Sequence, residues 1–139
     1  MARMLSGRYR TDKLMSKWST LNPSGHCRLP GCDSEDDGDL AHILLQCPAL
    51  AEARHRAISH WSSYLVPRSW LLPVVAHHTL SVESLHLQFL LDPSVLPMVI
   101  SSKKCQPDLL QSCFYLSRTW VFTMHLARMK IRQLWNLKN

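Results

Sequence analysis

Three cysteines and one histidine in the first third of the chain have the residue types and the spacing of a metal site. Four residues separate Cys27 from Cys32, nine separate Cys32 from His42, and four separate His42 from Cys47. Zinc binds such a set of three thiolates and one imidazole tetrahedrally. Because four protein ligands leave no open position for water, we expect one structural Zn²⁺ ion rather than a catalytic one.

The sequence between these residues favours the geometry that such a site needs. Leu29-Pro30-Gly31-Cys32 predicts a β-turn with proline at its second position and glycine at its third. Asp39 can cap a short helix that presents His42, and Pro48 disfavours a helical Cys47. Because positions five apart on an α-helix lie about 140° apart, the helix must unwind for His42 and Cys47 to share an ion.

Simpler interpretations of the same residues stay open. Cys27 and Cys32 can be ordinary small thiols and His42 a surface histidine, or His26 can replace His42 if the order of the ligands is different. The acidic run 33–39 resembles an EF-hand calcium loop, but the twelfth position of that loop, which must be glutamate, is Leu44.

No catalytic set is evident. A cysteine-protease pair of Cys113 and His125 would lie about 18 Å apart on one predicted helix, so we expect a chain that is not an enzyme.

Hydrophobic periodicity predicts a mainly α fold: a small zinc-braced helical domain with a long C-terminal helix. Short helices are expected from Thr11 and from Pro48, a third over 82–91, and a long helix from Asp108. The zinc-binding region is assigned to residues 1–65 and a helical C-terminal region to 66–139. The apolar face after Pro48 comprises Leu50, Ala53, Ala57, Ile58, Trp61 and Leu65, with Glu52, Arg54 and Arg56 toward solvent. The seam of the long helix comprises Leu109, Cys113, Leu116, Trp120, Met124, Ala127, Ile131 and Leu134.

Charge is distributed unevenly along this basic chain, which has a net charge of +6. Both ends are basic, whereas five of the ten acidic residues lie between Asp33 and Asp39. Because zinc held by three thiolates also carries negative charge, we expect the zinc loop to repel phosphate and the basic segments to bind it. The candidate nucleic-acid contacts are Arg8, Arg10, Lys13 and Lys17, then Arg54, Arg56 and a helical stripe of Arg118, Arg128 and Arg132. Each of them can equally be a solubilising charge.

No apolar run is long enough to span a membrane, and arginines interrupt the N-terminal residues before a signal-peptide core could form. The expected location is therefore intracellular, either nuclear or cytoplasmic. The sequence leaves the oligomeric state open.

Residues 5–65 resemble the C-terminal zinc-binding (CCHC) tail of non-LTR retrotransposon reverse transcriptases. The resemblance is carried by Leu5-Ser6-Gly7-Arg8-Tyr9-Arg10-Thr11-Asp12, by the Cys27/Cys32/His42/Cys47 set, and by Ala41-His42-Ile43-Leu44-Leu45-Gln46-Cys47-Pro48-Ala49-Leu50 with the following Glu52-Ala53-Arg54. Residues 91–94 and 116–120 resemble the same tails more weakly. Because polymerase, endonuclease and RNase H carboxylates are absent, the chain looks like a tail alone, a fragment or remnant.

The resemblance implies a non-catalytic tail that binds RNA or DNA. The alternative is a helical module that docks on protein, such as the reverse transcriptase core. On that alternative, Trp61, Trp70, Trp120 and Trp135 would form an exposed interface.

Overall fold

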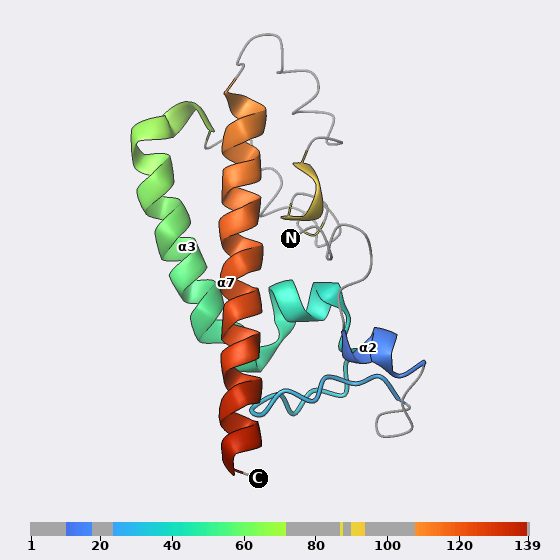
Figure 1. Cartoon of the computed structure of the whole chain (residues 1–139). Coiled ribbons are helices and arrows are strands. Elements are labelled where there is room, and N and C mark those ends of the chain that lie inside the picture. Colours follow the sequence, from blue (N-terminus) through green and yellow to red (C-terminus); the bar gives the residue numbers. More distant parts are fainter. Residues whose placement is uncertain (1–10, 18–23, 72–86, 88–89, 94–107, 139) are drawn as a thin grey trace.

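The computed structural model describes residues 11–17, 24–71, 87, 90–93 and 108–138, and this part of the chain is mainly helical, which confirms the predicted fold class (Figure 1). Among the described helices, none is both long and apolar enough for a membrane span. The elements are α2 (Asp12–Met15), the π-helical turn η1 (His42–Gln46), the 3₁₀ helices η2 (Pro48–Leu50) and η3 (Val66–Leu71), and the α-helices α3 (Ala51–Leu65) and α7 (Leu109–Lys138).

The expected helix over 82–91 falls mostly outside the described residues. Of that stretch, Leu87, Leu90 and Leu91 are described, and all three are helical.

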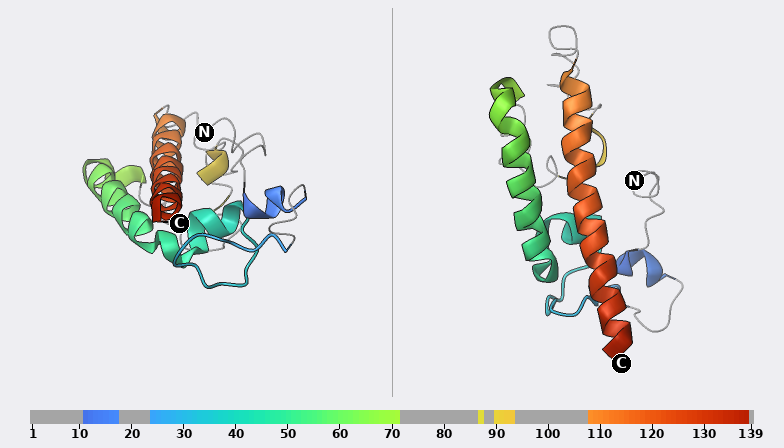
Figure 2. Two further views of the ribbon diagram at one scale, coloured as in Figure 1. Left: turned by 60° about the horizontal axis from the view of Figure 1, so that its bottom comes forward. Right: turned by 60° about the vertical axis from the view of Figure 1, so that its left-hand side comes forward.

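The helices α3 and α7 run antiparallel, side by side, and form the larger part of the structure (Figures 1 and 2). The buried side chains of α3 recur every four residues, at Ala53, Ala57, Trp61 and Leu65. This spacing places them on one narrow stripe of the helix, which packs against α7. Ile58, expected on the same face, is instead 51% exposed because the stripe that α7 covers does not reach it.

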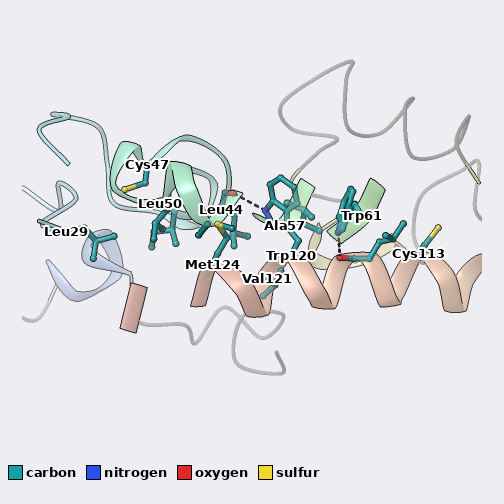
Figure 3. Packing of buried hydrophobic residues seen from close by; sticks show 14 of the residues in the cluster. Leu29, Leu44, Cys47, Leu50, Ala57, Trp61, Cys113, Trp120, Val121 and Met124 are labelled. Carbon is teal, nitrogen blue, oxygen red and sulfur yellow. Dashed lines mark hydrogen bonds between the residues drawn. The ribbon is translucent and has the colours of Figure 1, made fainter. Parts of the chain in front are cut away.

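Two tryptophans connect α3 to α7 and α7 to η1 (Figure 3). The Nε1 of Trp61 donates a hydrogen bond to the Leu116 carbonyl at 3.0 Å, and the Nε1 of Trp120 donates to the Leu44 carbonyl at 3.1 Å. The two rings pack at a centroid distance of 5.0 Å. The expectation that Trp61 and Trp120 form an exposed interface is therefore wrong, because both are core residues.

The C-terminal end of α7 extends beyond α3 (Figures 1 and 2). The predicted seam is buried from Leu109 to Met124, but Leu134 is 50% exposed and Trp135 is 53% exposed. The apolar periodicity of the sequence thus continues past the point where a partner element covers the helix.

Asp12, at the start of α2, links three parts of the fold. Its Oδ1 accepts a hydrogen bond from Nη2 of Arg132 at 2.7 Å, and its Oδ2 accepts one from the backbone N–H of Arg28 at 3.2 Å. Nη2 of Arg128 lies 3.9 Å from Oδ1. Gly38 permits this approach, since a Cβ atom there would lie 2.7 Å from the Cβ of Asp12. One carboxylate therefore holds α2 against both α7 and the loop that contains Cys27 and Cys32.

Replacing Trp120 with phenylalanine should lower the free energy of unfolding by about 1–3 kcal/mol, because the buried Leu44 carbonyl loses its donor. Trp135→Phe is the matched control, since this exposed side chain should change stability by less than about 0.5 kcal/mol. Chemical denaturation of the two variants measures the difference. Equal stabilities would mean that the Trp120 hydrogen bond does not contribute.

Candidate metal centre

The first two cysteines lie on a loop that turns back on itself. The Leu29 carbonyl accepts a hydrogen bond from the N–H of Cys32 at 2.9 Å, and Gly31 has a φ of 86°. These are the features of a type II turn, which needs a positive φ at its third residue. Backbone bonds from Cys27 to Asp36 (3.2 Å) and from Gly38 to Gly25 (2.9 Å) close the base of the loop. The predicted turn is confirmed.

The histidine and the third cysteine lie at the two ends of η1. Oδ1 of Asp39 accepts a hydrogen bond from the N–H of His42 at 2.9 Å, which confirms the predicted cap. The N–H of Cys47 bonds to the His42 carbonyl at 2.7 Å, a π-helical bond that spans five residues. This wider turn, followed by the non-helical ψ of 119° at Cys47, replaces the α-helical spacing that would separate the two side chains. The predicted departure from α-helical geometry before Pro48 is therefore present, as a π-helical turn.

The ligand atoms of Cys27, Cys32, His42 and Cys47 all lie within 4.8 Å of one another, and all four residues are buried. The Sγ atoms of Cys27 and Cys47 are 3.9 Å apart, and Sγ of Cys32 is 3.4 Å from Nε2 of His42. A tetrahedral ion with metal–sulfur distances of about 2.3 Å would place neighbouring ligand atoms roughly 3.5–3.8 Å apart. The four side chains can therefore hold a metal ion.

The pKa values of the buried thiols depend on their contacts with one another, and a bound cation would change them. The hydrogen-bond contact between the Sγ atoms of Cys27 and Cys47, and then burial, raise the pKa of Cys27, whereas the same contact lowers the pKa of Cys47. Burial raises the pKa of Cys32. Three thiolates in one small volume repel each other, so a bound dication is what would allow all of them to be charged.

Each sulfur also faces a backbone N–H two residues further along the chain. These N–H groups belong to Leu29 for Cys27, to Ser34 for Cys32 and to Ala49 for Cys47, and each one lowers the pKa of its thiol. Donors aimed at sulfur stabilise thiolate rather than thiol. The repetition of this contact at three cysteines favours a ligand role over that of ordinary buried thiols.

An acidic residue lies behind the histidine. Because Nε2 of His42 faces Cys32, its Nδ1 faces away from the sulfurs; this buried atom lies 3.9 Å from Oδ2 of Asp36. A carboxylate beside the far nitrogen of a metal-binding histidine favours the tautomer with its lone pair on the near nitrogen. Asp36 is one of five acidic residues between positions 33 and 39, and the sequence contains no signal that selects it as the partner of His42.

The candidate nucleic-acid contacts have different environments. Arg8 and Arg10 lie outside the described residues, and Lys13 lies in α2. Lys17, Arg56 and Arg118 are exposed, whereas Arg54 and Arg132 are partly buried and Arg128 is only 3% exposed. The predicted stripe of Arg118, Arg128 and Arg132 is thus not one basic surface, because Asp12 and α2 cover its central part. Arg54, which was expected to face solvent, is instead partly buried.

Comparison with protein families, with curated proteins and with solved structures finds no match for this chain. The geometry of the cluster and the surface around it are therefore the basis for a functional proposal.

Cys32→Ser should abolish metal binding and reduce the helicity of the segment from Cys27 to Leu65, because that variant removes one of four ligands from a site that joins two segments. Cys113→Ser is the matched control. Cys113 is buried in α7, where burial raises its pKa to about 12, and it lies outside the cluster. Metal content by mass spectrometry and circular dichroism before and after chelation measure the effect. Equal metal content in both variants would rule out the ligand role of Cys32.

Metal affinity should rise with pH. Because the pKa values of Cys27 and Cys32 are raised, both thiols carry protons at neutral pH, and a metal ion must displace them. The apparent dissociation constant should therefore fall as pH rises from 6 to 8, by about tenfold per pH unit for each proton released. Competition with a chelator at several pH values, corrected for the protonation of the chelator, measures this slope. A pH-independent affinity would contradict binding through these thiols.

Proposed function

We propose that the chain is a non-catalytic, zinc-stabilised module that binds nucleic acid, as its resemblance to the tails of non-LTR retrotransposon reverse transcriptases implies. Three thiolates and one imidazole suit Zn²⁺ better than Ca²⁺ or Mg²⁺, which prefer oxygen ligands. The four protein ligands would close the coordination shell, so the ion would act as a brace. By analogy with zinc-finger peptides, it would contribute on the order of 10–16 kcal/mol to folding.

The observation that carries the nucleic-acid proposal is the absence of acidic residues from most of the two packed helices. Glu52 is the one carboxylate in α3, and α7 has none along its whole length. Exposed cations on α7 are Arg118, Lys130 and Lys138. A polyanion lying along this pair of helices would meet positive charge and little repulsion.

Aromatic side chains gather around a different cation, Arg68, on the side where α3 meets the first half of α7. The rings of Tyr64 and Tyr115 stack at 4.4 Å, and the guanidinium of Arg68 lies 4.0 Å from the centre of the Tyr64 ring. His60 and Tyr115 share a hydrogen bond of 3.0 Å, and both are exposed. Surfaces that bind single-stranded nucleic acid combine aromatic rings with cations, because bases stack on the rings while the cations contact phosphate.

Binding should weaken as salt concentration rises, and Arg118→Ala combined with Lys130→Ala should lower affinity for single-stranded RNA about tenfold and reduce the salt slope by roughly 1.4. Gln133→Ala, on the same helix, is the uncharged control. Fluorescence anisotropy over a salt series, with RNA and with duplex DNA, measures both effects. Arg8→Ala with Arg10→Ala tests the N-terminal candidates in the same assay. An affinity that is independent of salt would refute the proposal.

A second function, docking on a protein such as the reverse transcriptase core, is favoured by a different observation. Phe122, Leu126, Met129 and Leu137 are large, exposed apolar residues on the side of α7 that faces away from the core. If this surface is an interface, the isolated chain should self-associate in light scattering and bind RNA weakly and without salt dependence.

A further inference from the structure

Arg54 differs from the other arginines of the module in how its charge is placed. It lies in the first turns of α3, seven residues after Cys47, and its side chain is partly buried. Its Nη1 atom is fully buried and has no hydrogen-bond partner among the described residues. Arg56, two residues further along the same helix, is exposed and bonds to Glu52 at 2.6 Å. The environment of Arg54 is therefore not that of a solvated surface cation.

A buried cation requires an opposite charge nearby, and the cysteine cluster provides one. Burial lowers the pKa of Arg54, but the charge of Cys47 acts in the opposite direction and raises it. Because α3 follows Cys47 through η2, and side chains on a helix tilt toward its N-terminus, the buried Nη1 of Arg54 is directed toward the end of the helix that adjoins this cysteine. With a dication bound, the three thiolates leave one net negative charge on the centre, and the single positive charge of Arg54 balances it.

We propose that Arg54 is the counter-charge of the metal centre, a positioning residue that stabilises the metal-bound thiolates rather than a contact for nucleic acid. This inference depends on the proposed zinc site. Pro48 and η2 connect Cys47 to α3, so the ligand and its counter-charge lie on one short, helical piece of chain. Residues that contact metal ligands from outside typically change metal affinity 10- to 100-fold when they are removed.

The test compares Arg54→Gln, which removes the charge but keeps length and hydrogen-bonding capacity, with Arg54→Lys, which keeps the charge. Arg56→Gln is the matched control, from the exposed side of the same helix. Zinc affinity by chelator competition, the pH at which half of the zinc is released on acidification, and RNA affinity are measured for zinc-loaded full chains. We expect Arg54→Gln to weaken zinc binding about tenfold and to release zinc at higher pH. Arg54→Lys should lose much less zinc affinity, and Arg56→Gln should keep the zinc affinity and the release pH of the unmodified chain.

The outcomes separate this inference from the function it rests on. If the unmodified chain binds no zinc, both the zinc site and the inference are wrong. If it binds zinc but Arg54→Gln has the same affinity and the same release pH, the inference alone is overturned. If Arg54→Gln keeps its zinc but loses RNA affinity, Arg54 is a nucleic-acid contact instead. Should Arg54→Gln fold too poorly to compare, Arg54→Lys decides: zinc affinity retained by this variant supports the charge role, and affinity lost with intact helicity overturns it.

Discussion

Four buried side chains from two short segments, with ligand atoms that lie within 4.8 Å of one another, connect the loop of Cys27 and Cys32 to η1. The loop from Ser24 to Asp39 has little regular structure of its own, apart from one isolated bridge between His26 and Asp37. Its buried apolar side chains are few, so packing alone provides a weak reason for it to fold. The cluster joins this loop to η1, whose Ile43 and Leu44 are buried, and the Leu44 carbonyl accepts the Trp120 hydrogen bond. A change at the cluster can therefore reach the α3–α7 core through η1.

Local rules predicted the parts of the site that depend on neighbours in sequence. The turn before Cys32, the Asp39 cap and the break at Cys47 each follow from one or two residues with strong backbone preferences, and the structure confirms all three. The long helix follows from its apolar periodicity in the same way. The predicted zinc ion and nucleic-acid contacts remain predictions, because the backbone preferences of single residues determine neither of them.

Contacts between distant residues explain what the sequence could not predict. Arg128 is buried because Asp12, more than a hundred positions earlier, lies beside it, and no periodic pattern within α7 contains that information. The sequence fits both a packed and an exposed position for Trp61 and Trp120, because tryptophan suits cores and interfaces alike. The choice depends on which carbonyls lie within reach of each Nε1.

The position of Asp12 has a practical consequence for anyone who shortens this chain. Asp12 is nearly buried, and its carboxylate neutralises charge from Arg132 and Arg128 while it also holds the backbone of Arg28. A chain trimmed past this residue would leave those two guanidinium groups without their carboxylate, on the same helix as the exposed cations. Such a fragment would be more basic at this point than the intact protein. Its affinity for a polyanion would then be increased by the truncation itself. Every shortened version should therefore keep Thr11 and Asp12.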